Sequence, residues 1–266
     1  AELRNRLRIV SEVAGDGAHE GFDPVGLLGK ARFEISQAIW DGALAELAKA
    51  DNASFEESAL LARCSVETDD QSALDDWAAS DDLASADDVP NQSSSDYWFA
   101  RGAYHAMHDE HRAAVRCFCQ CILIDPTDAQ AYRRLGTALN VIGMDGESRE
   151  AEARARLIEK TQELGAEMAA DKKRDVNKIA QMVELLIDLR RPVEALSWRG
   201  VKLAYDQSQG NISAQQAKEV LQEIIRDRKL TLGEQPPEID ESFLICGVDL
   251  RSLDDAAASS DGQETQ

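Results

Sequence analysis

The amino-acid sequence predicts an all-α protein built from repeated helical hairpins. The chain of 266 residues is rich in Ala, Leu and Glu, which favour helices, and only 5% of its residues are aromatic. The alternation of apolar and polar side chains that is typical of strands is almost absent. A repeat is also visible, because Tyr132 follows Trp98 and Gly136 follows Gly102, each after 34 residues (132 − 98 and 136 − 102). Repeats of this length indicate helical pairs that bury their apolar faces by stacking.

The clearest copy of the repeat lies in residues 98–126. It resembles the tetratricopeptide repeat (TPR), whose pattern is W-x2-L-G-x2-Y, then A-x3-F, then P. Arg101 and His105 replace the Leu and the Tyr of that pattern. The resemblance implies a right-handed superhelix of hairpins with a concave partner-binding face, and it implies that Trp98 and Phe118 are buried between helices. The matching residues are Trp98, Gly102, Ala114, Phe118 and Pro126.

Four further hairpins are expected around this one. In the next hairpin, Ser148 and Glu152 stand in the slots of the Ala and the Phe. Since these residues fit the slots poorly, we expect a lengthened turn over residues 143–146, followed by a long helix over 147–169. The other hairpins are expected over residues 177–205 and around turns at residues 39–42 and 69–71.

Changes of composition divide the chain into five segments. Residues 65–95 contain no Lys or Arg, and repeated Asp residues followed by Pro90 indicate an acidic, solvated loop at the end of this stretch. Pro236 and Pro237 end the preceding helix, and the last residues, mostly Ala, Ser, Asp and Gly, are expected to be disordered. The segments are an N-terminal segment (1–23), degenerate TPR-like hairpins (24–80), an acidic loop (81–95), TPR hairpins with a final helix (96–229) and a partly disordered tail (230–266).

The charge of the chain limits its partners. There are 29 Lys and Arg against 50 Asp and Glu, which gives a formal net charge of −21. This charge repels phosphate backbones and anionic lipid surfaces, so neither nucleic acid nor a membrane is expected as a partner. No apolar segment approaches the roughly 20 residues that span a bilayer. A protein or peptide partner is therefore expected.

The cysteines indicate a reducing compartment. Their number is odd, and their spacings match no disulfide framework for a chain of this length. We therefore expect reduced thiols and a cytoplasmic protein. The cysteines are Cys64, Cys117, Cys119, Cys121 and Cys246.

Two motifs resemble the N-terminal half of larger bacterial proteins that carry TPRs ahead of FG-GAP and UnbV-type β-propeller modules. One is L-R-R-P-x-E-A-L over residues 189–196, and the other is F-L-x-x-G-V-D-L over residues 243–250. The resemblance implies that the chain is an interaction region of a larger protein, and such parents are often exported. The chain also does not begin with Met, as expected of a trimmed fragment. An exported location is therefore the alternative to the cytoplasm. The second motif rests on Phe243, Leu244, Gly247, Val248, Asp249 and Leu250.

Motifs for catalysis or metal binding are weak or absent in the sequence. His105 and His108 are three residues apart on a predicted helix and lie near Cys117 and Cys121 in the sequence, but no ligand motif accompanies them. Cys121 also fits a TPR slot for a small buried residue, which needs no metal. No P-loop, nucleophile elbow or dinucleotide-binding motif is present. We therefore expect no cofactor, no metal and no enzyme activity.

The candidate binding site is the concave face that the TPR resemblance implies. Arg133 and Arg134 are of interest because a partner carboxylate can pair with arginine in a strongly acidic chain, although an ordinary solvated helix face explains them equally well. Phe99 and Ala103 stand where TPR domains that clamp chaperone tails carry Lys and Asn, so that clamp is not reproduced. The candidate ligand-binding residues are Phe99, Arg133, Arg134, Thr137, Asn140, Asn177, Gln181 and Glu184.

Three functions follow from these observations. The first is a non-catalytic scaffold that binds a peptide or protein on the concave surface, by analogy with the fold. The alternative is a structural spacer or assembly region of a larger multidomain protein. The third, a metal-dependent enzyme, rests only on the histidines and cysteines described above.

Overall fold

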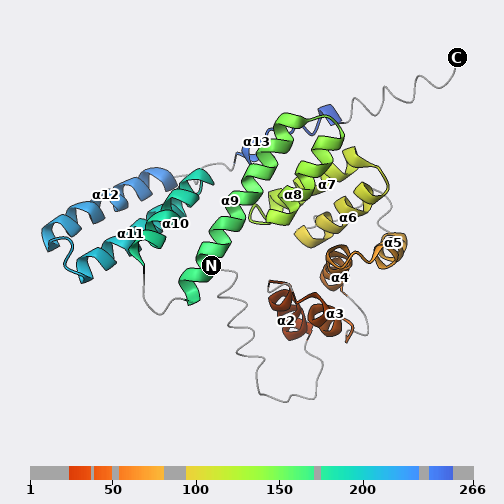
Figure 1. Ribbon diagram of the computed structural model, residues 1–266, viewed down its shortest axis with the longest axis horizontal. Helices are drawn as coiled ribbons and strands as arrows, with labels where there is room; N and C mark the ends of the chain where they lie inside the picture. The colour runs from red at the N-terminus through yellow and green to blue at the C-terminus, as the bar shows by residue number, and fades with distance from the viewer. Residues whose placement is uncertain are drawn as a thin grey trace. The chain divides into compact units, whose positions relative to one another are not determined.

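The computed structural model describes residues 24–36, 39–49, 54–80, 94–170, 175–233 and 240–253. These ranges contain twelve helices and no strand, which confirms the all-α prediction (Figure 1). The described residues belong to two compact units, one formed by residues 1–126, 137–145 and 249–266 and the other by residues 127–136 and 146–248. The helices are α2 (Pro24–Ser36), α3 (Trp40–Leu47), α4 (Phe55–Glu67), α5 (Gln71–Ser80), α6 (Ser95–Met107), α7 (His111–Ile124), α8 (Ala129–Val141), α9 (Asp145–Ala170), α10 (Val176–Asp188), α11 (Pro192–Ser208), α12 (Ala214–Leu232) and α13 (Glu241–Leu244).

The helices pair as hairpins, as the sequence predicts. In the first unit α2 packs on α3, α4 on α5 and α6 on α7, and in the second unit α10 packs on α11. Helices α8 and α9 form the remaining hairpin, in which the Ser148 hydroxyl donates a hydrogen bond to the Gly136 carbonyl at 2.8 Å. The final helix α12 packs on α11. The described residues therefore form the helical-hairpin arrangement that the sequence predicts.

A common turn joins the two helices of a hairpin. Asp69, Asp109, Gly143 and Arg190 each have a positive φ between 52° and 79°, and each comes two residues after its helix ends. The N–H of the next residue then bonds to a carbonyl five residues earlier, as Glu110 does to His105 at 2.9 Å. This is the Schellman arrangement that closes helix C-termini.

The structure corrects two expectations about the turns. No lengthened turn occupies residues 143–146, because Gly143 makes the same turn as Asp109, and α9 begins at Asp145. The turn expected over residues 39–42 is also wrong, since Trp40, Asp41 and Gly42 lie in α3.

Two glycines let the helices of their hairpins approach closely. A Cβ atom added at Gly102 would lie 2.7 Å from Cε1 of Phe118, and one at Gly136 would lie 3.2 Å from Cγ of Glu152. Glu152 follows Phe118 by 34 residues, the same number that separates the two glycines. The sequence repeat is therefore also a structural repeat, in which equivalent residues make equivalent contacts. Phe118 is buried as expected, whereas Trp98 is only partly buried. The neighbouring Tyr97 fills the core instead.

Four first helices of hairpins and the final helix α12 begin in the same way. Each has a side-chain cap on the residue before the helix, which accepts a hydrogen bond from an N–H of the first turn and so satisfies a donor that the helix leaves open. The caps are Ser54 of α4, Ser94 of α6, Asp128 of α8, Asp175 of α10 and Ser213 of α12. Positions in these helices can therefore be compared by counting from the cap.

Part of the predicted tail is folded. The Tyr132 hydroxyl donates a hydrogen bond to the carbonyl of Leu244 at 3.0 Å, which fastens α13 to α8 within the second unit. Ile245 and Val248 are buried. The expected N-terminal segment at 1–23, most of the acidic loop, and residues 234–239 and 254–266 of the tail lie outside the described residues.

Candidate functional site

The exposed side of α10 carries three of the predicted residues. Asn177, Gln181 and Glu184 are spaced by four and three residues, so they lie on one face of the helix, and all three are exposed. The opposite face is apolar and packs against α9 and α11. Its residues are Met182, Val183, Leu185 and Leu186, which cluster with Leu164 of α9 and Ala195 of α11.

Three more predicted residues share one face of α8. Arg133, Thr137 and Asn140 follow the same spacing and are exposed, whereas Arg134 is partly buried. The other face of the helix carries the buried residues Tyr132, Leu135 and Leu139. We call the exposed faces of α8 (Arg133, Thr137, Asn140) and α10 (Asn177, Gln181, Glu184) the first-helix stripes.

Arg133 already has a carboxylate partner. Its Nε and one terminal nitrogen donate to the two oxygens of Glu159, both at 2.5 Å, so the guanidinium fork is filled. This hydrogen bonding raises the pKa of Arg133 above its ordinary value. The side chain remains 52% exposed, so the pair stands at the surface. A partner carboxylate would therefore have to compete with Glu159 for Arg133.

Phe99 does not lie on an exposed groove, which corrects the sequence-based expectation. Its side chain is 0% exposed, because α6 packs against α4 as well as α7. The Arg63 guanidinium of α4 lies 4.2 Å from the centre of the Phe99 ring, and the Phe118 ring centre is 6.1 Å away. Phe99 is a core residue in this structure, with no surface to offer a ligand.

His105 and His108 have local partners, and the Cys117 thiol is buried. His105 lies 2.5 Å from a carboxylate oxygen of Glu110, and Nδ1 of His108 lies 2.9 Å from the Tyr104 carbonyl oxygen. Burial raises the pKa of the Cys117 thiol to about 12, so it stays protonated and is a poor nucleophile and metal ligand. Within the described ranges, no group of three or more His, Cys, Asp or Glu side chains could hold a metal ion.

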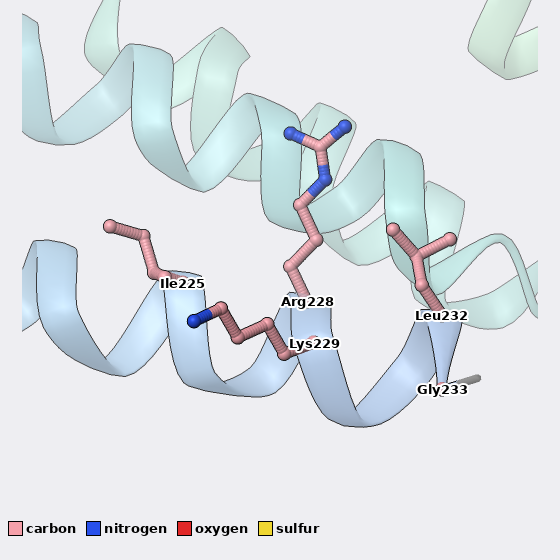
Figure 2. A pocket seen from close by; sticks show the side chains of 5 residues that line it. All are labelled: Ile225, Arg228, Lys229, Leu232 and Gly233. Atoms are coloured by element: carbon pink, nitrogen blue, oxygen red, sulfur yellow. The ribbon is translucent and has the colours of Figure 1, made fainter.

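Helix α12 carries a surface that the sequence analysis missed. An open hollow along this helix is lined by Ile225, Arg228, Lys229 and Leu232, together with Gly233, as Figure 2 shows. The sequence places apolar residues on more than one side of α12, but it does not tell which of them are exposed. None of the helices that the structure describes is long and apolar enough to span a membrane.

Comparisons with known proteins add little to this description. No protein-family model matches the chain, and no curated protein matches it. A solved structure described as the crystal structure of MamA protein is similar to 70% of this chain and 93% of its own chain, at 15% identity and a TM-score of 0.31. The helices, turns and repeat themselves define the class, an all-α protein of TPR-like helical hairpins.

Proposed function

We propose that the chain is a non-catalytic scaffold that binds a protein or peptide on the first-helix stripes. The observation that carries the proposal is the placement of Asn177, Gln181 and Glu184, which form an exposed polar row on a helix whose other side is fixed in the core. Such a row presents hydrogen-bonding groups at helical spacing on a rigid support, which favours recognition of a partner backbone or polar side chains.

The described part of the tail leaves this row accessible. Residues 240–248 contact the second unit through Tyr132, Arg154 and Arg190, and none of these belongs to the first-helix stripes. A tail covering the predicted site would favour the structural-spacer alternative, and these contacts of residues 240–248 lie outside that site. The net charge of −21 also favours a protein partner over a nucleic acid. The described cysteines are buried free thiols, which supports a reducing compartment.

The experiment is affinity capture from the source cell with matched variants. The site variant is Asn177→Ala/Gln181→Ala/Glu184→Ala, and the control is Glu163→Ala/Gln207→Ala, which changes exposed residues of α9 and α11. Both should keep the helical circular dichroism of the natural protein, since exposed substitutions change stability little. We expect a specific partner to be captured by the natural protein and the control but lost by the site variant. Equal capture by all three would contradict binding on α10.

A further inference from the structure

Helix α12 stands in the register of a first helix, but no helix among the residues that the structure describes packs on it as a second helix. The eighth residue after the cap is where a first helix receives its second helix, as shown by Gly102 against Phe118 and Gly136 against Ser148 and Glu152. This position is buried in the four complete hairpins with capped first helices. Its residues are Ala62, Gly102, Gly136 and Val183. In α12 the same position is Leu221, which is 46% exposed.

Three of the exposed apolar residues of α12 form a stripe along the helix, whereas Leu230 lies on the opposite side. Leu221, Ile225 and Leu232 are spaced by four and seven residues and therefore share one face, which differs from the face that packs on α11. Ile225 is 47% exposed, although isoleucine is usually buried. The face toward α11 uses Ala217 and Ile224 instead, which cluster with Leu196 and Leu203.

Charges are segregated around this stripe. Lys218, Arg228 and Lys229 lie beside Leu221, Ile225 and Leu232 on the helical wheel, whereas Glu219 and Glu223 lie on another exposed face. The three basic residues have no ion-pair partner among the residues that the structure describes. Figure 2 shows Arg228 and Lys229 beside Ile225 and Leu232 along the hollow. The chain as a whole is strongly acidic, with a net charge of −21, so this basic border differs in sign from the protein around it.

The described tail does not supply the missing helix. Beyond α12, Phe243 packs elsewhere in the second unit, 3.6 Å from the Arg154 guanidinium and 3.8 Å from that of Arg190. The last residues, 254–266, contain no Leu, Ile, Val, Phe or Met that could fill an apolar stripe.

We propose that this face of α12 binds an acidic amphipathic helix of a partner protein, which takes the place of the missing second helix. The face consists of Lys218, Leu221, Ile225, Arg228, Lys229 and Leu232, and we call it the α12 face. An apolar ridge on the partner covers the exposed leucines and isoleucine, and Asp or Glu beside that ridge pairs with the basic border. The α12 face shares no residue with the first-helix stripes, so each proposal can be tested independently of the other.

The test uses the full chain and a fluorescent synthetic peptide of about five helical turns. The acidic peptide carries Leu at positions i, i+3, i+4 and i+7 with Glu beside the ridge. One control peptide replaces each Glu by Lys, and a second has the same composition in scrambled order. Binding is measured by fluorescence anisotropy. Three variants are compared with the natural protein: Leu221→Gln/Ile225→Gln, Lys218→Glu/Arg228→Glu/Lys229→Glu, and the matched control Glu219→Gln/Glu223→Gln.

We expect the acidic peptide to bind the natural protein and the control variant with equal affinity. The apolar variant should bind it at least about tenfold more weakly, as for central residues of interfaces. The charge-reversed variant should lose the acidic peptide and gain the Lys peptide. Circular dichroism should be unchanged, since all the substituted residues are exposed.

Three results would overturn the proposal. One is an acidic peptide that binds no more tightly than the scrambled peptide. Another is an affinity for the acidic peptide that is the same in both α12-face variants as in the natural protein. The third is sedimentation equilibrium showing a dimer of the natural protein that Leu221→Gln/Ile225→Gln dissociates, because a second copy would then cover the face.

Discussion

The ring of Phe118 lies against Gly102, so close that a Cβ atom at residue 102 would be 2.7 Å from Cε1 of the ring. Both residues are buried between α6 and α7. We expect Gly102→Ala to lower the free energy of unfolding by about 1–3 kcal/mol, because the added methyl group overpacks the hairpin. The measurement is urea unfolding followed by circular dichroism. Gly200→Ala is the matched control, since nothing lies within 4 Å of its Cβ position in α11. It should stabilise the protein by about 0.5–1 kcal/mol, and a destabilised control would undermine this comparison.

Removal of the Phe118 ring should destabilise the protein more than Gly102→Ala does. Phe118 is 1% exposed, and its ring packs edge-on against that of Phe99. Phe118→Ala should therefore cost about 3–5 kcal/mol, the range for large-to-small changes of core aromatic residues. A cost below about 1 kcal/mol in the same urea experiment would show that the ring contributes little to the core.

The turns offer a test of backbone strain. Asp109 has a φ of 60° and Gly143, at the same position of the next repeat, has a φ of 79°. Because the left-handed region costs residues with a Cβ free energy, Asp109→Gly should stabilise the protein slightly, by up to about 1 kcal/mol. Gly143→Ala should destabilise it by about 1 kcal/mol. Thermal unfolding of the two variants checks both predictions. Unfolding temperatures that shift in the same direction in both variants would argue against a shared turn geometry.

The Phe243 ring is one of the contacts that hold residues 240–248 in place. Phe243 lies between the guanidinium groups of Arg154 and Arg190, at 3.6 Å and 3.8 Å. Phe243→Leu keeps an apolar side chain but removes the cation–π attraction, worth about 0.5–2 kcal/mol per contact. Amide hydrogens of residues 244–248 should then exchange faster, whereas Phe243→Trp should keep them protected. Unchanged exchange in the Leu variant would show that Phe243 does not fasten the tail.

The buried thiols predict an alkaline loss of stability. Burial raises the pKa values of Cys64, Cys117 and Cys246 from 9.0 to about 12. The folded state therefore holds these protons more tightly than the unfolded state, so the contribution is complete below pH 9 and is lost as pH rises toward 12. Cys117→Val should fall in stability less steeply than the natural protein between pH 8 and pH 11. Parallel curves would contradict the raised pKa.

Much of the fold was predictable because the repeat is local. Trp98, Gly102, Ala114 and Phe118 define helix spacing within one hairpin, and a turn with a positive φ follows from residues such as Gly143. The lengthened turn was a wrong inference, because Ser148 looks unsuited to a small-residue slot. In the structure its hydroxyl bonds to the Gly136 carbonyl, which makes a buried serine acceptable.

The binding site was less predictable because it depends on neighbours distant in the sequence. Phe99 looked like a groove residue until α4 was seen to pack on α6 and bring Arg63 over its ring. Arg133 looked like a free cation, yet Glu159, 26 residues later, fills its fork. Exposure of α12 likewise depends on the lack of a covering helix, which no local pattern reveals.

The pairing of Arg133 with Glu159 gives a sensitive test of the first-helix stripes. If a partner carboxylate uses Arg133, Glu159→Gln should strengthen binding of the captured partner, because the competing charge is removed. Stability should change by no more than about 1 kcal/mol, as for exposed ion pairs. Isothermal titration calorimetry with the captured partner measures the affinity. Weaker binding in the Glu159→Gln variant would instead mean that Glu159 holds Arg133 in its working position.

The most direct measurement is the affinity of Arg133→Glu/Arg134→Glu for the partner captured from the source cell, at low and moderate salt. We expect the double variant to bind much more weakly with its helical content intact, and we expect natural-protein binding to weaken as salt rises, because exposed charges are screened over about 8–10 Å. Unchanged affinity in the variant, together with natural-protein binding that does not change with salt, would contradict recognition through Arg133 and Arg134 and favour the structural-spacer role.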